Sequence, residues 1–433
     1  MRLTQRFGWI VIIMIICISC TYAGELAILT QIGLGSKDTT GIKNAGKVIS
    51  SSNGRDIYIG SNNHGLISQF LRDSTNGFLT FVASTDSIPY ITDMVLSPDE
   101  RFLYVATLDK NTLECYSRDV FTGSLKFSSR IEINPNQNWF DIPFHLCLNQ
   151  PGKNLYVVSD DAVSVFSRDS LTGLLSFRQM LLDERGGITE LAGASSIDIS
   201  HDGKTAYVAS YKDSCISWYH VDSTTGTLSY TGMVRANGNN YYVLKSPDLV
   251  RVSENGKYVI ASSSGALAWF TRNQVNGELT FGGELLCHNA TLDGLYEIDE
   301  FRLFAGGTRL VTAAGVSSGL FSVDTSNGKI FWLETTVIPP IPNQFHHGTS
   351  VALCANNIYV TGYDGTLTIL KWTQNIVSVN YFNSLNNRTV GLNTGCLSDL
   401  LGRKVKLPND RSHSSVFLAS HGSLYSKWIS ERK

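Results

Sequence analysis

Short apolar runs bounded by polar turn residues follow one another along most of the chain, and the pattern recurs about every 50 residues. Its clearest copy, Leu96–Ala106 (LSPDERFLYVA), joins a Ser-Pro-Asp turn to an apolar run rich in aromatic and β-branched residues. Residues of these types between turn signals indicate β-strands rather than helices. The further copies are SSNGRDIYIGS (51–61), NQPGKNLYVVS (149–159), ISHDGKTAYVAS (199–210), VSENGKYVIAS (252–262), FAGGTRLVTAA (304–314) and CANNIYVTG (354–362).

One aromatic position aligns the seven copies at steps of 46 to 52 residues. It is occupied by Tyr58, Tyr104, Tyr156, Tyr207, Tyr258, Leu310 and Tyr359. Within each copy, the polar turn that precedes this position is expected to join the first strand of a unit to the second as a tight hairpin.

A second turn, of the form Asp-x-x-Thr-Gly or a close variant, follows each of the first six copies. Its aspartate accepts hydrogen bonds from nearby backbone donors and its glycine supplies a positive φ, so we expect it to join a third strand to a fourth. The glycines are Gly77, Gly123, Gly173, Gly226, Gly277 and Gly328. Four strands in each of seven units predict an all-β fold, a seven-bladed β-propeller over residues 24–385 followed by a short C-terminal β extension over residues 386–433.

Closure of such a ring requires a strand from one end of the chain to join the blade at the other end. The run Glu25–Ile32 (ELAILTQI) precedes the first full unit and resembles an outermost strand. We expect it to dock on the last blade; the alternative is that Val377–Leu385 completes that blade.

The first 23 residues have the layout of a secretory signal peptide. Arg2 and Arg6 give a positive start, Phe7–Cys20 is an apolar run of 14 residues, and Ala23 ends a stretch typical of a cleavage site. The run is short for a membrane anchor, and no later run reaches the roughly 18 apolar residues of a membrane helix. The prediction is therefore a secreted, periplasmic or cell-surface protein, with acylation of Cys20 as a lipoprotein variant.

Charge and cysteine content narrow the class of protein further. Lys and Arg number 35 against 37 Asp and Glu, a net charge of −2, which argues against a nucleic-acid binder that relies on a basic face. The cysteines after the signal peptide are widely spaced and form no C-x-x-C motif, so we expect buried thiols rather than a metal site, with one long-range disulfide left open. They are Cys115, Cys147, Cys215, Cys287, Cys354 and Cys396.

The pairing of a "SPDGKxLYVA" signature with a "SRDxxTGxL" signature resembles the seven-bladed propeller lactonase family, the group around bacterial 6-phosphogluconolactonase and its YVTN-repeat relatives. The resemblance covers about residues 25–385 and implies the propeller fold. Those enzymes carry Gly-Pro-Arg-His-type stretches near the blade centres, whereas the nearest stretch here, Ile142–His145 (IPFH), keeps Pro and His without Arg. The resemblance therefore implies lactone chemistry less strongly than it implies the fold.

The tail over residues 386–433 departs from the 50-residue rhythm. Its segments LSDLLGRKV (397–405), SVFLA (415–419) and KWI (427–429) resemble the C-terminal sorting domain of type IX secretion. Ser415 stands where that pattern has Gly and Phe417 where it has Tyr. The alternative is a two- or three-stranded extension that packs on the last blade.

The start of each inner strand offers a candidate site, because these positions lie closest to the propeller axis. The seven matched residues are Lys47, Asp93, His145, Ser196, Leu249, Glu300 and Ser350. Four of them are ionisable, and unpaired burial of such groups is costly, so we expect them around a polar channel that pairs them or holds a ligand. A His between carboxylates there is expected to change its protonation between about pH 6 and 8.

Three loops expected on the same face combine amides with aromatic or His side chains, a composition suited to sugar or peptide recognition. Their candidate ligand-binding residues, beside Glu300 of the ring, are Trp139, Tyr241, Tyr242, His346 and His347. Adjacent His residues on a strand point to opposite sides, and no H-x-H or H-x-x-x-H accompanies them, so no metal and no cofactor is predicted.

Two functions remain open from the sequence. The first is an exported, monomeric binding module for a glycan, small molecule or protein at the loop-rich face. The second is a hydrolase that opens a lactone or sugar-acid ester, in which His145 acts as general base, Lys47 stabilises the oxyanion and Asp93 orients the imidazole. Nucleotide, hydride and acyl-transfer motifs are missing from the sequence, so those chemistries gain no support.

Overall fold

The computed structural model describes most of the repeat region and a short segment near the C-terminus. The described residues are 26–32, 42, 45–61, 65–85, 90–108, 111–132, 143–236, 241–288, 294–338, 348–362 and 364–373 of the repeat region, together with 417–420 and 423–426. The chain divides into two compact units, Met1–Asn375 and Ile376–Lys433. The domain limits predicted from the sequence stay predictions.

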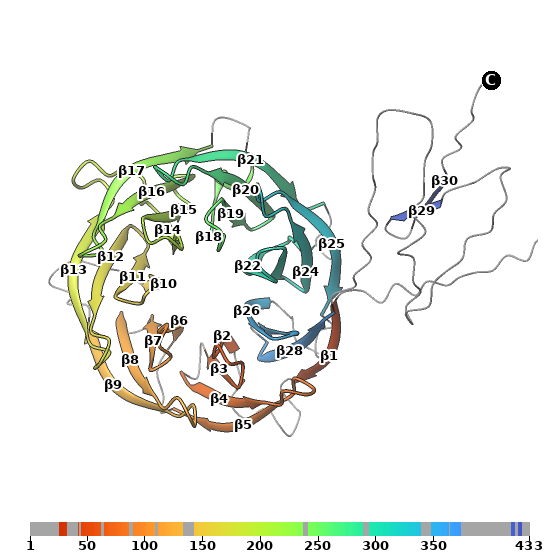
Figure 1. The fold of residues 1–433 in the computed structure, drawn as a ribbon, viewed down its shortest axis with the longest axis horizontal. Coiled ribbons are helices and arrows are strands. Elements are labelled where there is room, and N and C mark those ends of the chain that lie inside the picture. Colours follow the sequence, from red (N-terminus) through yellow and green to blue (C-terminus); the bar gives the residue numbers. More distant parts are fainter. Residues whose placement is uncertain are drawn as a thin grey trace, which may run out of the picture. The chain divides into compact units, whose positions relative to one another are not determined.

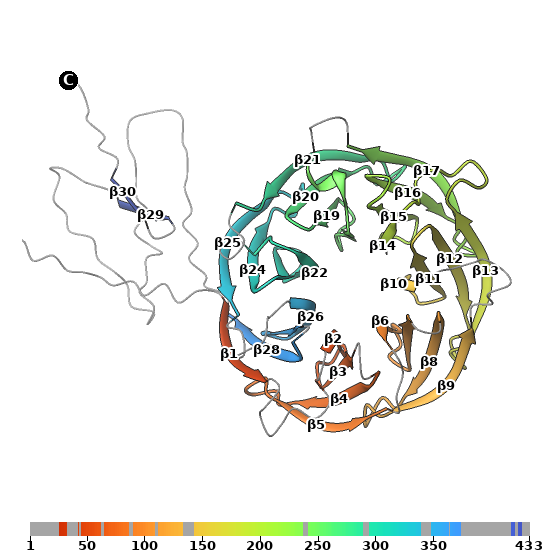
Figure 2. The ribbon, with the colours of Figure 1, turned by 180° about the vertical axis from the view of Figure 1, so that it is seen from behind.

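The repeat region forms seven four-stranded antiparallel sheets arranged in a ring (Figure 1), seen from behind in Figure 2. In chain order the first six blades are β2 (Ala45–Ser50), β3 (Asp56–Ser61), β4 (Ile67–Arg72) and β5 (Leu79–Ser84); β6 (Ile91–Leu96), β7 (Phe102–Thr107), β8 (Thr112–Arg118) and β9 (Leu125–Glu132); β10 (Pro143–Leu148), β11 (Asn154–Ser159), β12 (Ala162–Arg168) and β13 (Leu175–Leu182); β14 (Ala194–Ile199), β15 (Thr205–Ser210), β16 (Cys215–Val221) and β17 (Leu228–Arg235); β18 (Leu249–Val252), β19 (Tyr258–Ser263), β20 (Ala266–Arg272) and β21 (Leu279–Leu286); β22 (Ile298–Phe304), β23 (Arg309–Ala314), β24 (Ser317–Val323) and β25 (Ile330–Val337). The seventh contains β26 (Gly348–Cys354), β27 (Asn357–Gly362) and β28 (Thr366–Trp372). The predicted all-β, seven-bladed propeller is confirmed.

The ring closes through the N-terminal strand β1 (Leu26–Ile32). This strand pairs antiparallel with β28, with Leu26 opposite Trp372 and Ile32 opposite Leu367, and completes the sheet order β1-β28-β27-β26. The expected docking of the N-terminal run on the last blade is confirmed. The alternative segment, 377–385, lies outside the described residues.

Within a blade, burial follows the position of each strand. The second strand, such as β7 or β15, is buried at every residue, because both of its faces pack on neighbouring blades. The outermost strand, such as β5, is largely exposed. One short helix interrupts the strands of the described residues, the single turn η1 (Val243–Lys245) before β18. In the C-terminal unit, β29 (Phe417–Ser420) and β30 (Ser423–Ser426) form a hairpin.

The two repeated sequence signatures meet between neighbouring blades. The Tyr104 hydroxyl of blade 2 donates to the carbonyl of Gly173 in the second turn of blade 3 at 2.8 Å, and accepts from Nε of Arg168 at 2.9 Å. Nη2 of the same Arg168 binds the Asp99 carboxylate at 2.7 Å. The same Tyr–Gly bond recurs as Tyr58–Gly123, Tyr156–Gly226, Tyr207–Gly277 and Tyr359–Gly77. We call this contact the inter-blade latch.

We call the place of Tyr104 in its blade, and the matching place in each other blade, the latch position. In two blades the strand pairing assigns this position to a different residue from the one aligned by sequence. Tyr104 pairs with Cys115, three residues before the Arg118 that ends its strand, whereas Tyr258 pairs with Thr271, immediately before the corresponding Arg272. The strand pairing therefore gives the latch position to Ile260 in blade 5 and, by the same comparison, to Val311 in blade 6. The expected alignment of Tyr258 and Leu310 was wrong, because it matched residues by type. The second strand has six residues in every blade and its third residue is the latch position, which is Ile260 in β19 and Val311 in β23.

The glycines of the second turn have φ between +74° and +81°, as predicted. They are also crowded, because each turn packs against the preceding blade. A Cβ on Gly173 would lie 2.3 Å from Cδ1 of Phe102. Gly186 has a similar φ of +66°, but a Cβ on that residue would meet nothing within 4 Å, so the two sites separate backbone strain from crowding.

We predict that Gly173→Ala lowers the free energy of unfolding by roughly 2–4 kcal/mol, because φ strain and a steric clash add. Gly186→Ala should cost only about 1–2 kcal/mol, from φ strain alone. Urea unfolding of both variants measures the difference. Equal losses at the two positions would show that the turn does not pack tightly against the neighbouring blade.

Candidate functional site

The seven predicted channel residues occupy one register of the ring. Each pairs with the residue two positions after the latch position of its own blade, as Lys47 does with Gly60, Asp93 with Ala106 and His145 with Val158. The remaining pairs are Ser196–Ala209, Leu249–Ser262, Glu300–Ala313 and Ser350–Thr361. We call these seven residues the channel ring. A β-bulge directly precedes six of them, for example between Ile91 and Asp93.

Three members of the channel ring hold neighbouring backbone in place. An inner strand has no partner on its axial side, so its amides there need other acceptors. Oδ2 of Asp93 accepts from the backbone N–H of Leu146 at 2.7 Å. The hydroxyls of Ser196 and Ser350 accept in the same way from Val250 at 3.4 Å and Val48 at 3.3 Å. Polar residues at this register therefore have a structural use as acceptors for backbone N–H groups, in addition to the pairing or ligand binding expected from the sequence.

Glu300 is the centre of the charge network. Its carboxylate lies 2.8 Å from Nη2 of Arg251, 3.5 Å from Nε of Arg302 and 3.7 Å from Nζ of Lys47, and its side chain is only 2% exposed. Burial acts to raise the pKa of Glu300, but the three cations outweigh it and lower the pKa to about 2. Glu300 is therefore a fixed negative charge at neutral pH.

Lys47 bridges the two carboxylates of the channel ring. Nζ lies 3.7 Å from Oδ1 of Asp93 and 3.7 Å from Oε2 of Glu300. Burial acts to lower the pKa of Lys47, and the charges of Asp93 and Glu300 more than offset it, so the pKa is raised. The ammonium group is therefore retained, as an electrostatic role requires.

His145 is buried and uncharged. Its ring nitrogen Nδ1 is buried without a hydrogen-bond partner, and the residue is 8% exposed. Burial lowers the pKa of His145 to about 3; the charge of Asp93 opposes this shift, while Arg251 and Lys47 add to it. The expected titration between pH 6 and 8 was wrong, because burial and the two cations outweigh the carboxylates. The expected orientation by Asp93 also gains no hydrogen bond, since Asp93 binds Leu146 and faces Lys47 instead.

Sequence reasoning missed the residues two positions further along three inner strands, namely Asp198, Arg251 and Arg302. Asp198 accepts from the N–H of Val252 at 2.8 Å, and Nε of Arg251 is buried without a partner. Side chains two residues apart on a strand lie on the same face, so counting two residues on from each predicted ring residue would have found them. The matched position in blade 3 is Cys147, whose thiol lies 3.7 Å from Asp198.

The predicted loop residues are only partly within the described chain. Trp139, His346 and His347 lie outside it. Tyr241 packs against Phe281 with ring centroids 4.0 Å apart, so its ring belongs to the blade interface rather than to a free binding surface. Tyr242 is 46% exposed and lies beside the ammonium group of Lys245.

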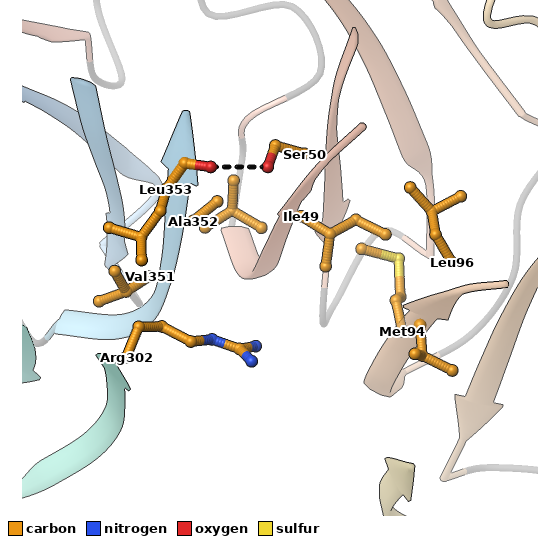
Figure 3. A pocket seen from close by; sticks show the side chains of 10 residues that line it. Ile49, Ser50, Met94, Leu96, Arg302, Val351, Ala352 and Leu353 are labelled. Atoms are coloured by element: carbon orange, nitrogen blue, oxygen red, sulfur yellow. Dashed lines mark hydrogen bonds between the residues drawn. The ribbon is translucent and has the colours of Figure 1, made fainter. Parts of the chain in front are cut away.

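A cavity of about 280 Å³ lies along the inner strands of blades 1, 2 and 7, on the hairpin-turn side of the channel ring (Figure 3). Its walls come from residues 48–50, 94–96 and 351–353, with Arg302 of blade 6. The cavity therefore lies on the opposite side of the channel ring from the loop-rich end, where the sequence predicted a pocket. Arg302 connects the cavity with the channel ring, because it lines the cavity and contacts Glu300 of the ring.

In the described residues, neither the cysteines nor the other possible metal ligands form a further functional site. Cys115, Cys147, Cys215 and Cys354 are buried thiols outside any disulfide, as predicted, whereas Cys287 is only half-buried, and Cys396 lies outside the described residues. No group of three or more His, Cys, Asp and Glu side chains there is placed to hold a metal ion. Nor do the described residues contain a helix long and apolar enough to span a bilayer.

Comparison with known proteins identifies relatives of this architecture. The sequence model of a family described as "Lactonase, 7-bladed beta-propeller" matches residues 15–140 and 141–291, more than half of the chain. A 6-phosphogluconolactonase of Enterobacter sp. (strain 638) is 30% identical over 166 residues, which are 38% of this chain and 44% of the relative, so the match spans less than half of the relative's length.

Two solved structures show the same fold. A periplasmic gluconolactonase of Pseudomonas aeruginosa is 16% identical with a TM-score of 0.56, over 68% of this chain and 86% of that one. A protein from Lactobacillus plantarum is 20% identical with a TM-score of 0.56, over 68% and 86% of the two chains. At these identities the likeness concerns the fold alone.

The burial of His145 predicts an acid-sensitive fold. Between its ordinary pKa of 6.5 and the folded value of about 3, the unfolded chain binds a proton that the folded chain does not. The free energy of unfolding therefore falls as pH decreases through this window, by about 1.4 kcal/mol per pH unit for one proton. Glu300 adds its own loss only below its ordinary pKa of 4.5. Burial raises the pKa of Asp248 to about 6, and this acts in the opposite direction between pH 6 and 4, so the difference in slope between a His145 variant and the parent reports on His145.

Urea unfolding at several pH values tests this. We expect the free energy of unfolding of His145→Gln to fall less than that of the parent as the pH decreases from 6.5 to 5, with a difference in slope of about one proton. Identical slopes for the parent and His145→Gln would mean that His145 is not held neutral by burial.

Proposed function

Because the chain belongs to the lactonase family of seven-bladed β-propellers, we propose that it hydrolyses a lactone at the channel ring. The observation that carries the proposal is His145, an uncharged imidazole whose Nδ1 is buried without a partner and whose pKa responds to the charges of Lys47 and Glu300. A general base must be unprotonated, and a neutral imidazole meets that condition across the physiological pH range. The low pKa makes it a weak base, so it needs a carbonyl activated by nearby cations.

The proposed reaction uses the charges around the ring. A water molecule attacks the lactone carbonyl while Nδ1 of His145 takes its proton. Lys47 and Arg251 stabilise the negative charge that develops on the carbonyl oxygen, as preorganised cations do in a buried site. The ring C–O bond then breaks, and the imidazolium returns its proton to the leaving alkoxide, which leaves a hydroxy acid. Glu300 holds both cations in position, and Asp93 positions Lys47.

A second candidate is the binding module for a glycan, small molecule or protein. It is favoured by the exposed Tyr242 beside Lys245 at the start of blade 5, and by the structural use of Asp93, Ser196 and Ser350 as backbone acceptors. In that case the channel ring is a scaffold, and the ligand contacts the loops around Trp139, Tyr242 and His346–His347.

We also propose that the chain acts outside the cytoplasm. The predicted signal peptide over residues 1–23 supports this, as does the relative named a periplasmic gluconolactonase; export by a type IX route through residues 386–433 is a narrower form of the same proposal. N-terminal sequencing of protein recovered from culture supernatant or a periplasmic extract should begin at residue 24. An intact residue 1 on protein found only in the cytoplasm would contradict it.

Lactone hydrolysis is measurable as acid release in a pH-stat. We expect the purified chain to open members of a panel of γ- and δ-lactones that includes glucono-δ-lactone. His145→Gln should lower kcat/KM about 10²- to 10⁴-fold, the usual contribution of a general base. The matched control His220→Gln should leave kcat/KM unchanged, and melting temperatures should show that both variants fold.

Full activity of His145→Gln would exclude His145 as the base. Failure to open any lactone, combined with binding of a glycan or peptide that Tyr242→Ala abolishes, would favour the binding module instead.

A further inference from the structure

The cavity of about 280 Å³ is bordered by the axial edges of three inner strands. An inner strand pairs with its blade on one side only, so every second residue directs its N–H and C=O toward the channel. Contacts between blades identify these residues. The N–H groups of Val48, Leu146 and Val250, each one position after a channel-ring residue, donate to a side chain of the preceding blade. By the same alternation, the residue three positions after each ring residue also faces the channel.

In blades 4 and 5 this second set of axial N–H groups is bound by one carboxylate. Asp198 accepts from Ile199 at 2.9 Å and from Val252 at 2.8 Å. Blades 7, 1 and 2 have no acceptor at the place of Asp198, where the matched residues are Ala352, Ile49 and Val95. The inner strands of these three blades are the ones that border the cavity.

The cavity therefore has backbone donors that no side chain uses. They are the N–H groups three positions after the ring residues of blades 7, 1 and 2, which belong to Leu353, Ser50 and Leu96. No side chain of the described residues accepts a hydrogen bond from them. Carbonyl groups lie on the same edges, and one of them, that of Leu353, accepts from the Ser50 hydroxyl at 2.9 Å (Figure 3). A ligand in the cavity thus meets both donors and acceptors of the backbone.

Arg302 brings a positive charge into the same cavity. Its Nε lies 3.5 Å from Glu300, and this is the one ion pair that Arg302 makes with the described residues. The terminal nitrogens Nη1 and Nη2 have no hydrogen-bond partner in the described part of the chain. In Figure 3 the guanidinium extends toward the middle of the labelled lining residues. The free side of the guanidinium is therefore available to a ligand in the cavity.

The charges around Arg302 leave room for one negative charge. Three cations surround Glu300, and Asp93 is the second carboxylate beside them. Burial raises the pKa of Asp198, so this group offsets the third cation less than an ordinary carboxylate does. A carboxylate carries a single charge, and its two oxygens match the paired donors of a guanidinium.

We propose that the cavity binds a small hydroxycarboxylate, whose carboxylate is held by Arg302 and whose hydroxyl group pairs with the axial backbone edges of blades 7, 1 and 2. A hydroxyl both donates and accepts, so it can use the N–H and the C=O groups of these edges. Lactone hydrolysis releases a compound of this class, and the cavity gives that product a place to bind on the hairpin-turn side of the ring. Only the link to the product rests on the proposed function; the binding site itself does not.

Titration calorimetry in a buffer free of carboxylates tests the site. We expect 4-hydroxybutyrate to bind the parent protein about tenfold or more tightly than its uncharged amide, 4-hydroxybutyramide, because a hydrogen bond between charged groups is stronger than one between neutral groups. Arg302→Gln should lose this preference. Arg302→Lys should keep part of it, since lysine retains the charge without the paired donors. The matched control is Arg178→Gln at an exposed position of β13, which should keep the parental affinity.

Equal affinities for the acid and the amide, or parental affinity in a folded Arg302→Gln protein, would overturn the inference. Preference for inorganic phosphate over 4-hydroxybutyrate would also overturn it, since the site would then select a higher charge rather than a carboxylate. Melting temperatures show whether the variants fold. If Arg302→Gln does not fold, the acid–amide comparison in the parent protein and the affinity of Arg302→Lys decide.

A pH-stat assay of γ-butyrolactone separates this site from the proposed function. Binding of 4-hydroxybutyrate without turnover of any lactone would overturn lactone hydrolysis and leave the carboxylate site standing. Turnover without such binding would overturn the site alone. If both hold, 4-hydroxybutyrate should inhibit the opening of γ-butyrolactone, and absence of inhibition at a saturating concentration would overturn the link to the product.

Discussion

The hydrogen bond from a tyrosine hydroxyl of one blade to a glycine carbonyl of the next joins five pairs of neighbouring blades, and the packing of the ring depends on it more than on any other repeated contact. Tyr104 shows its full form, with Gly173 as acceptor and Arg168 as a donor that also reaches Asp99. A single blade cannot bury both faces of its sheet, so the repeats are stable only when stacked. The latch fixes how they stack, because it joins the second strand of one unit to the last turn of the following one. The two sequence signatures are thus the two sides of one contact between neighbours.

The latch lies away from the propeller axis. The innermost strand of each blade therefore keeps one edge whose backbone groups have no partner strand. That edge is satisfied by side chains such as Asp93, whose carboxylate accepts the Leu146 amide. Charged residues at this register must pair with one another, because an unpaired buried charge is strongly destabilising. Glu300 and its three cations are such a set. His145 alone keeps a buried nitrogen without a partner in this register of the described chain, which is why the proposed chemistry centres on it.

The sequence was sufficient for the fold and for the positions of the channel ring, because both follow from a repeat with a fixed strand period. It was insufficient for the neighbours of Glu300, since only Lys47 of its three cations lies in the matched register, while Arg251 and Arg302 lie two residues further on. The protonation of His145 was misjudged because its pKa depends on burial, and burial is not visible in a strand pattern. The alignment of Tyr258 failed for a different reason, because it matched tyrosine to tyrosine. Counted from the glycine of the first turn, the residue that matches Tyr207 is Ile260.

The central claim is that the channel ring is where the chemistry takes place, and a crystal structure with a hydrolysis-resistant lactam tests it most directly. The account predicts lactam density between His145 and Arg302, with the carbonyl oxygen within hydrogen-bond distance of Arg302, Arg251 or Lys47 and a water molecule on Nδ1 of His145. Density at the outer loops around Tyr242, with the ion pairs of Glu300 and the environment of His145 unchanged, would contradict it.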